Sequence, residues 1–423
     1  MRNEETRKND SRDAGLPAQF LTQLRWIVLG VLTGAVTGLI GTGFYYAVRF
    51  ATSFRMDHSW TIFLLPLGGL AIAAMYHLAG ETEDPGTNLV IHTITGDGSI
   101  PLRKAPLVIA ATTLTHLFGG SSGREGAALQ FGGSIGYNLG LLFRLKEGDR
   151  RIITMCGMSA AFAALFGTPL TAAFFAMEMS SVGILYYAAL VPCALSALTA
   201  SALAEYLGAE KEVFYVRVVP ELSVKSGISY GLLAILGALA AVLFCIALHT
   251  AGRLYGKYLK NRYLRIFTGG VLVMALTLLS GTRMYNGAGM SVINSAVQGN
   301  APPEAFLLKM LFTALTLGAG YKGGEIVPSL YIGATFGCLF SNLFGTLPAL
   351  SAAIGMGALF CGVTNCPIAS LLLCFELFGY LGMPYYLIAI AFSYTFSGYY
   401  SLYSAQKIVY SKTENKYINR KAH

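Results

Sequence analysis

A glycine-rich stretch within an apolar region decides the fold: Gly119-Gly120-Ser121-Ser122-Gly123-Arg124-Glu125-Gly126. A similar stretch reads Gly318-Ala319-Gly320-Tyr321-Lys322-Gly323-Gly324-Glu325-Ile326-Val327-Pro328, with Gly324 standing 201 residues after Gly123. Glycine permits tight turns and lets other groups approach the backbone closely. Both stretches are therefore expected to interrupt helices.

The two stretches belong to an internal repeat. Gly132 and Gly136 follow the first, and Gly333 and Gly337 follow the second at the same offset of 201 residues. Further on, Thr168-Pro169-Leu170 and Cys366-Pro367-Ile368 are matched at an offset of 198, and each proline is followed nine residues later by Glu178 or Glu376. Helix C-termini disfavour acids, so we expect these two carboxylates to bond backbone and to be structural. Repeats with broken helices at corresponding positions indicate a transporter with its site between the repeats.

Composition places the chain in a membrane. Hydrophobic residues make up 54% and charged residues 12% of the 423 residues, whereas soluble domains carry about 25% charged residues. Mean hydropathy is +0.57. Membrane-spanning helices are expected at Leu24–Val48, Trp60–Leu78, Ile184–Leu203, Ile228–Leu248 and Ile266–Leu279. Between Pro106 and Phe143, and between Ala305 and Leu347, glycines predict short or broken helices that line a cavity.

The net charge of +9 is spread in a way that does not favour nucleic acid. One cluster comprises Arg253, Lys257, Lys260, Arg262 and Arg265, and a second follows Lys407 to the C-terminus. Basic clusters between or after apolar segments are typical of cytoplasmic loops. The alternative is that these basic residues are solvated loop charges that do not indicate which side of the membrane they lie on.

The remaining composition indicates neither a metal site nor a cofactor. The seven cysteines lie in apolar stretches without a CxxC pair, so they are expected to be small buried hydrophobes. The first 21 residues are polar and charged, which does not fit a cleavable signal peptide, and the first apolar run is expected to act as the membrane signal.

Glu125 is the main candidate for chemistry. An ionisable pair such as Arg124 and Glu125 inside a membrane segment usually marks an ion or proton path. Gly123 and Gly126 would let amides approach a ligand, and a helix starting at Ala127 would direct its positive end at the same point. A carboxylate held there could occupy the anion position when ionised and leave it when protonated. The alternative is an ion pair that only pins a turn.

The second break offers the amides of Ile326 and Val327 as free donors, because Pro328 suits an early helical position. Glu325 either takes part in coupling or pairs with Lys322 as a buttress. A third candidate is the segment 84–90, where Pro85, Gly86, Thr87 and Asn88 open an apolar segment and either bind the anion or only cap a helix. Tyr403, in Ser401-Leu402-Tyr403-Ser404, either donates to the anion from the inner end or is an interfacial tyrosine.

Together these motifs resemble the CLC family of chloride channels and proton-coupled antiporters, over residues 22 to 406. Residues 123–126 look like the family's GREGP motif, whose Glu is the gate and proton acceptor, and residues 324–328 look like its GxFxP motif. The segment 401–404 resembles the one that carries the family's anion-binding Tyr. The resemblance implies an all-α integral membrane fold of two inverted repeats of tilted and broken helices, and a homodimer with one pore per subunit.

Several departures resemble the fluoride/proton antiporter clade. Ala127 replaces the Pro of GREGP, and Pro85, Gly86 or Thr87 fills the place of the Ser in the family's GSGIP motif. Met179 stands where chloride/proton antiporters carry an internal proton-relay Glu. Lys322-Gly323-Gly324-Glu325 also precedes the second helix. The resemblance therefore implies exchange of fluoride for protons and fluoride export.

We expect a short cytoplasmic segment at 1–21, a transport domain at 22–406 with repeats at about 60–206 and 226–397, and a basic cytoplasmic tail at 407–423. The expected partners are fluoride or chloride ions, protons and the lipid bilayer of the inner (cytoplasmic) membrane. The alternative is a chloride/proton antiporter or chloride channel on the same scaffold. A membrane enzyme would need a catalytic constellation, and the sequence has neither HExxH nor GxSxG. A receptor or structural protein would not explain the paired breaks with an Arg–Glu pair.

Overall fold

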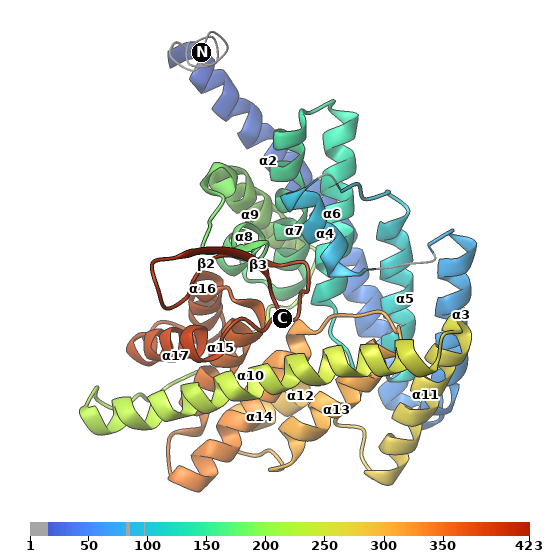
Figure 1. Cartoon of the computed structure of the whole chain (residues 1–423), viewed down its shortest axis with the longest axis vertical. Helices are drawn as coiled ribbons and strands as arrows, with labels where there is room; N and C mark the ends of the chain where they lie inside the picture. The colour runs from blue at the N-terminus through green and yellow to red at the C-terminus, as the bar shows by residue number, and fades with distance from the viewer. Residues whose placement is uncertain (1–15, 82–84, 97) are drawn as a thin grey trace.

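A computed structural model describes residues 16–81, 85–96 and 98–423, and the described chain is an array of helices with one small sheet (Figure 1). The helices of the first half are α2 (Leu16–Asp57), η1 (Ser59–Leu64), α3 (Leu65–Leu78), α4 (Thr87–Thr95), α5 (Lys104–Phe118), α6 (Glu125–Leu142), α7 (Glu147–Phe166), α8 (Pro169–Glu178), η2 (Tyr187–Ala189) and α9 (Leu190–Tyr206). Those of the second half are α10 (Val224–Tyr258), α11 (Arg262–Leu279), α12 (Met290–Val297), α13 (Ala305–Gly318), α14 (Ile326–Phe344), α15 (Pro348–Thr364), α16 (Pro367–Phe378) and α17 (Met383–Phe396).

Six helical segments are long and apolar enough to cross a membrane: Phe20–Asp57, Ser59–Leu78, Tyr187–Tyr206, Val224–Tyr258, Arg262–Leu279 and Ile326–Phe344. Four of them contain an expected span and Tyr187–Tyr206 covers all but the first three residues of Ile184–Leu203, which confirms those expectations. Their outer faces carry exposed apolar side chains, such as Leu232, Leu239, Leu243 and Ile246 along α10. Side chains of this kind are stable against lipid and costly against water.

Both glycine-rich stretches interrupt helices, as predicted. The first break separates α5 from α6, and the second separates α13 from α14. Gly119 and Gly320 have φ angles of +90° and +107°, a left-handed region that side chains with a Cβ rarely adopt. The prediction that the helix after the first break starts at Ala127 is wrong. Arg124 is the N-cap and α6 begins at Glu125, so the carboxylate belongs to the first helical turn.

The two breaks are bonded directly to each other. The Gly123 N–H donates to the Gly324 carbonyl at 2.6 Å, and the Gly324 N–H donates to the Gly123 carbonyl at 2.7 Å. This antiparallel bridge is locally two-fold symmetric, which fits an inverted arrangement of the repeats. A Cβ on Gly324 would collide with the backbone of Glu125 and Gly126, so only glycine allows this approach.

The second matched pair of motifs meets in the same symmetric way. The Glu178 carboxylate, at the end of α8, accepts hydrogen bonds from the amides of Ile368 and Ala369 at 3.2 and 3.0 Å. The Glu376 carboxylate, at the end of α16, accepts from the amides of Leu170 and Thr171 at 2.9 and 2.8 Å. Each acid therefore caps the N-terminus of the antiparallel helix in the other repeat. These contacts satisfy amides that would otherwise be orphans at a helix start.

A small three-stranded sheet packs against the helices. Strands β1 (Ser181–Val182), β2 (Lys407–Tyr410) and β3 (Tyr417–Lys421) lie in that order, with β1 parallel and β3 antiparallel to β2. Between β2 and β3, the Lys412 ammonium donates to Asn365 and Ser397 at 2.5 and 3.2 Å. Burial lowers the pKa of Lys412 to about 8. Residues 407–421 thus pack against the helical domain through specific contacts.

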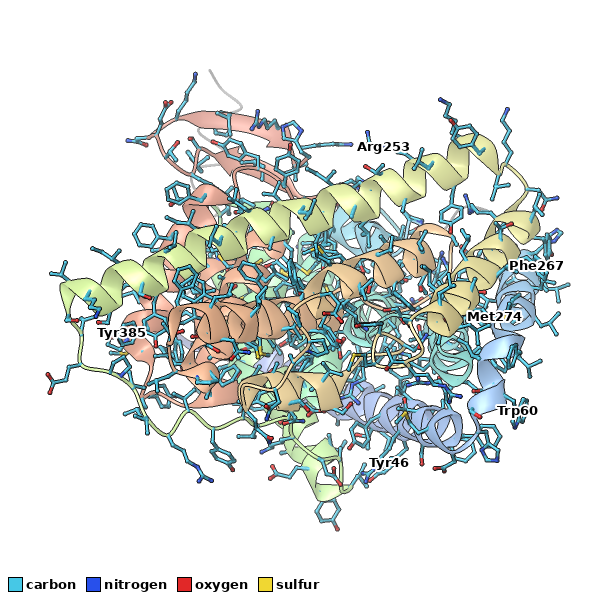
Figure 2. The ribbon with its side chains drawn as sticks, turned by 90° about the horizontal axis from the view of Figure 1, so that it is seen from below. Tyr46, Trp60, Arg253, Phe267, Met274 and Tyr385 are labelled. Carbon is cyan, nitrogen blue, oxygen red and sulfur yellow. The ribbon has the colours of Figure 1, made fainter. Side chains whose placement is uncertain are left out.

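The basic cluster at 253–265 lies on the same side as this sheet. In Figure 2, Arg253 and the β2–β3 hairpin lie along one side of the molecule, and Tyr46 and Trp60 lie along the opposite side. The expectation that this cluster is a loop is wrong for most of its members. Arg253 and Lys257 belong to the last turns of α10, and Arg262 and Arg265 begin α11. Cations at the end of a helix are stabilised by its dipole, which favours continuing α10 through them.

The reciprocal caps predict a loss of stability when one acid is removed. Glu178→Ala leaves the amides of Ile368 and Ala369 without their acceptor in a buried place, because Glu178 is only 7% exposed. We expect a loss of roughly 1–3 kcal/mol in the free energy of unfolding, measured by denaturant titration in detergent micelles. Glu414→Ala is the matched control, because this exposed glutamate uses only its backbone for hydrogen bonds. Equal midpoints for the two variants would contradict the capping role.

Candidate functional site

Four segments far apart in the sequence meet around the Gly123–Gly324 bridge. The Thr87 hydroxyl lies 3.5 Å from the Gly126 carbonyl, which joins the start of α4 to the start of α6. The Asn88 side chain accepts a hydrogen bond from the Ala405 amide at 2.9 Å, which joins α4 to the loop that carries Tyr403. The starts of α4, α6 and α14 and the loop after α17 therefore form one junction.

Glu125 is completely buried at this junction. Its Oε2 atom accepts a hydrogen bond from the Arg124 amide at 2.9 Å. Its Oε1 atom is buried and lacks a hydrogen-bond partner among the described residues. A buried carboxylate oxygen without a donor costs free energy unless a proton, a water molecule or another ligand satisfies it. The environment of Glu125 is therefore suited to a group whose charge changes during function.

Arg124 is held mainly by groups other than Glu125. Its Nη2 atom donates to the Leu165 carbonyl at 3.0 Å and lies 3.5 Å from a Glu212 carboxylate oxygen. The guanidinium also lies 5.1 Å from the centre of the Tyr45 ring. Its Nε atom is 3.4 Å from Glu125 Oε1, without hydrogen-bond geometry. Burial raises the pKa of Glu212, in the loop before α10, and the nearby Arg124 opposes that shift.

Glu325 is the N-cap of α14 and lies next to the first break. A Cβ on Gly126 would be 3.1 Å from Glu325 Oε2, so this carboxylate lies against the start of α6. The expected buttress with Lys322 is not formed. The Lys322 ammonium lies 4.6 Å from the centre of the Tyr76 ring in α3, and no ion pair between Lys322 and Glu325 occurs among the described residues. The α14 start has no side-chain cap, so the amides of Ile326 and Val327 receive no acceptor from a capping residue.

Only part of the segment at the start of α4 lies at the junction. Thr87 is buried, whereas Pro85 is exposed on the surface, and Asp84 lies outside the described residues. The expectation that Thr87 or Asn88 caps the helix is wrong. Gly86, with φ of +62°, is the N-cap, and no side chain caps α4. Asn88 instead bonds the Tyr403 loop, a tertiary contact that its position in the sequence does not reveal.

Tyr403 is 1% exposed, so it lies in the interior and not at a membrane interface. Its hydroxyl is buried without a hydrogen-bond partner in the part of the chain that the structure describes. A buried hydroxyl donor without an acceptor is a suitable anion ligand, because an anion would satisfy it.

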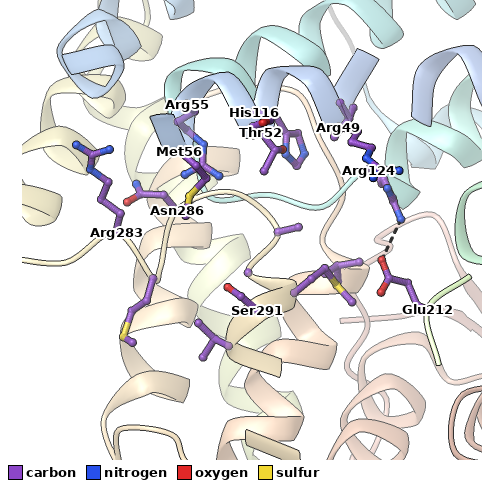
Figure 3. Close-up of a pocket in the computed structure, with 18 of the residues that line it drawn as sticks. Arg49, Thr52, Arg55, Met56, His116, Arg124, Glu212, Arg283, Asn286 and Ser291 are labelled. Carbon is purple, nitrogen blue, oxygen red and sulfur yellow. Dashed lines mark ion pairs between the residues drawn. The ribbon is translucent and has the colours of Figure 1, made fainter. Parts of the chain in front are cut away.

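A cavity of about 820 Å³ is lined by Glu125 and by Tyr45 and Met56 of α2, the helix whose Tyr46 lies on the side opposite Arg253 (Figure 2). Figure 3 shows Arg124 and Glu212 at one end and Arg55, Asn286 and Arg283 at the other. The Arg49 guanidinium on the same cavity lies 3.1 Å from Glu210. An anion could therefore reach Glu125 from this side through a passage with several cations in its wall.

Sequence reasoning missed three buried ionisable side chains on or behind this cavity. Arg55 in α2 is 6% exposed, and Lys309 in α13 is fully buried and donates to the carbonyls of Tyr285 and Gly287 at 3.1 and 2.6 Å. His116 in α5 is also buried, and its Nε2 atom lies 3.2 Å from the Gly123 carbonyl. Their signal was available, because each is an ionisable residue within an apolar segment.

Comparisons with known proteins agree with this architecture. Residues 68–398 match the model of the voltage gated chloride channel family. A chloride/fluoride channel protein of Pseudomonas syringae pv. tomato is 36% identical over 395 residues, covering 92% of this chain and 87% of the relative. The H(+)/Cl(-) exchange transporter ClcA of Vibrio cholerae serotype O1 is 28% identical over 393 residues, covering 83% and 81%.

Solved structures give the same result. The crystal structure of a CLC-type fluoride/proton antiporter superposes with a TM-score of 0.89 at 31% identity, covering 93% of this chain and 99% of that one. A slow cyanobacterial Cl-/H+ antiporter, 20% identical with a TM-score of 0.75 and covering 88% and 94%, shares the fold. With its paired helix breaks, bonded repeats and buried glutamate, this chain belongs to the voltage gated chloride channel (CLC) family.

Proposed function

We propose that this protein exchanges fluoride for protons across the cytoplasmic membrane and so exports fluoride. The observation that carries the proposal is the buried Glu125 carboxylate, which has an unpartnered oxygen at the start of α6 and lines an open cavity. The names of two similar proteins, a chloride/fluoride channel protein and a fluoride/proton antiporter, support fluoride as the anion.

The coupling follows from competition for one place. Free amides at a helix start attract either a side-chain carboxylate or a diffusing anion. Ionised Glu125 competes with the anion, and protonated Glu125 does not. Proton uptake would therefore free the place for an anion, and anion departure would let the ionised carboxylate return. The anion would bind among Gly123, Arg124, Gly126, Gly86, Thr87, Asn88, Ile326, Val327 and Tyr403.

Fluoride is favoured over chloride by the donors and by the second acid. Fluoride is small and strongly hydrated, so it binds only where strong hydrogen-bond donors replace its water. The Tyr403 hydroxyl is one such donor, and a protonated Glu325 carboxyl next to Gly126 would be another. The alternative is a chloride/proton antiporter or chloride channel, in which chloride would replace fluoride at the same ligands.

The assembly and orientation belong to the same proposal. We place the Arg253 side and the hairpin at 407–421 in the cytoplasm, because basic segments stay inside. Two subunits would each contain a complete pore, since all the proposed ligands come from one chain. The repeats are assigned to about 60–206 and 226–397, with segments 1–21 and 407–423 on the cytoplasmic side.

The first functional prediction concerns selectivity. Purified protein in liposomes loaded with fluoride or chloride should release fluoride at least about tenfold faster. Chloride accepts weaker hydrogen bonds, so it offsets less of the free-energy cost of leaving the buried donors without water. Ion-selective electrodes measure the release, and a pH electrode records proton entry. Equal rates for both anions would favour the alternative that the protein is a chloride/proton antiporter or a chloride channel.

The second functional prediction concerns Glu125. Glu125→Gln keeps the shape and removes the titrating charge, so an imposed proton gradient should no longer drive fluoride uphill. Glu325→Gln is the matched control, because it makes the same change on the other side of the Gly123–Gly324 bridge. Proton coupling should be lost in Glu125→Gln, whereas Glu325→Gln should chiefly reduce the fluoride preference. Unchanged proton-to-fluoride ratios in Glu125→Gln would exclude it as the coupling residue.

The third functional prediction concerns orientation. Lys260→Cys and Glu414→Cys should resist an impermeant thiol reagent added to intact cells, and Asp57→Cys on the opposite side should react. All three positions are exposed, and the seven native cysteines are buried, so background labelling should be low. Reaction of either of the first two variants from outside would reverse the proposed orientation.

A further inference from the structure

Two arginines on the cavity, one buried and one partly exposed, have no carboxylate partner in the part of the chain that the structure describes. Arg55 and Arg283 line the cavity, and neither forms an ion pair within residues 16–81, 85–96 and 98–423. By contrast, Arg49 and Arg124 on the same cavity lie 3.1 and 3.5 Å from the carboxylates of Glu210 and Glu212. The end of the cavity at Arg55 and Arg283 therefore has an excess of positive charge.

Arg55 is the more informative of the two because it is 94% buried, with a relative exposure of 6%. Its Nε atom is buried without a hydrogen-bond partner in the described chain. Arg55 occupies the last turn of α2, where the helix dipole favours a cation. That effect does not supply an acceptor for the buried N–H, and leaving such a charged donor unsatisfied is costly.

Other groups around Arg55 add to the positive potential. A Cβ built on Gly287 would lie 2.7 Å from Arg55 Nη2 and 3.9 Å from His116 Nδ1, so both side chains converge on this loop. Lys309 donates to the Gly287 carbonyl from behind and is fully buried, also without an ion pair in the described residues. The side chains of Arg55 and Lys309 thus lie against residues 283–289, and Lys309 also lies 5.0 Å from the centre of the Tyr331 ring.

The helix that follows this loop presents its N-terminus to the same space. Helix α12 begins at Met290, its N-cap is Gly289, and no side chain caps it. Gly289, Met290 and Ser291 line the cavity together with Arg55. Figure 3 shows Ser291 below Asn286, with Arg55 above and Arg283 to the left of Asn286. The first amides of α12 and the Arg55 guanidinium, whose Nε atom lacks a partner in the described chain, are therefore donors that line the same cavity.

We propose that this wall is a second anion-binding site, at which a halide or similar small monovalent anion is held between Arg55, Arg283 and the start of α12 before or after it passes Glu125. This proposal rests on the proposed transport of an anion, and it adds a binding site outside the central junction. Guanidinium groups and helix amides in a water-accessible cavity bind halides with little selectivity, so the site concentrates anions and leaves the choice of anion to the junction.

The kinetic test compares the two faces of the protein. Right-side-out and inside-out membrane vesicles present the cavity and the Arg253 side in turn. Arg283→Gln and Arg55→Gln should raise the half-saturating fluoride concentration from the cavity side about three- to tenfold. The maximal rate and the proton-to-anion ratio should change less than about twofold, and Arg283→Lys should recover most of the affinity because it keeps the charge.

Arg253→Gln is the matched control, since it removes one exposed arginine from the opposite side. It should not alter the half-saturating concentration on the cavity side. If Arg253→Gln raised the half-saturating concentration equally, the effect would come from the net charge of the protein and not from a local site, and the proposal would be overturned. An unchanged value in Arg283→Gln, which is partly exposed and should fold normally, would also overturn it.

A binding test separates this site from the proposed transport function. Crystals of the full chain grown in bromide should show an anomalous peak between Arg55 and Arg283, and this peak should be lost in Arg283→Gln. If the parent protein moves no halide but the peak is present, the transport proposal fails and the site stands. If fluoride is transported and the bromide peak is absent, the site fails and the transport proposal stands.

Discussion

Backbone that leaves the helix inside a bilayer must find hydrogen bonds within the protein, because lipid offers none. In this chain the requirement is met where the two breaks exchange the Gly123 and Gly324 hydrogen bonds, at 2.6 and 2.7 Å. The exchange brings the starts of α6 and α14 together and places Glu125 and Glu325 next to each other. The other parts of the junction, at Thr87, Asn88 and Tyr403, are arranged around it.

The hydrogen bonds that each carboxylate accepts distinguish the structural acids from the functional one. Glu178 and Glu376 each accept two amide hydrogen bonds from the opposite repeat, so their charge is compensated by fixed donors. Glu125 keeps one oxygen without a donor, although it is more deeply buried than Glu178. A fully compensated acid gains little by taking up a proton, whereas an incompletely compensated one can exchange its partner. This difference marks Glu125 as the group whose state can change.

The cations follow the same distinction. Arg124 is fixed by Leu165, Glu212 and Tyr45, which keeps its charge near Glu125 without closing the cavity. Arg55, Arg283 and Lys309 have no acid among the described residues to neutralise them, and they lie on or directly behind the cavity wall. The resulting field attracts anions toward the junction and repels cations. An anion that enters through the cavity would therefore meet this field before it reaches the ligands of the junction.

The sequence by itself determined the membrane fold class, the spans, the two breaks and the pairing of the repeats. Apolar runs and glycine-rich interruptions are local patterns, and matched offsets reveal symmetry without coordinates. It also singled out Glu125, because an acid beside an arginine is conspicuous between apolar segments. Only the tertiary structure decided that Asn88 bonds the Tyr403 loop, that the Lys322 ammonium lies next to the Tyr76 ring, and that Arg55 Nε has no hydrogen-bond partner among the described residues. These facts depend on which side chains meet across more than a hundred residues of chain, and residue spacing carries no information on such distances.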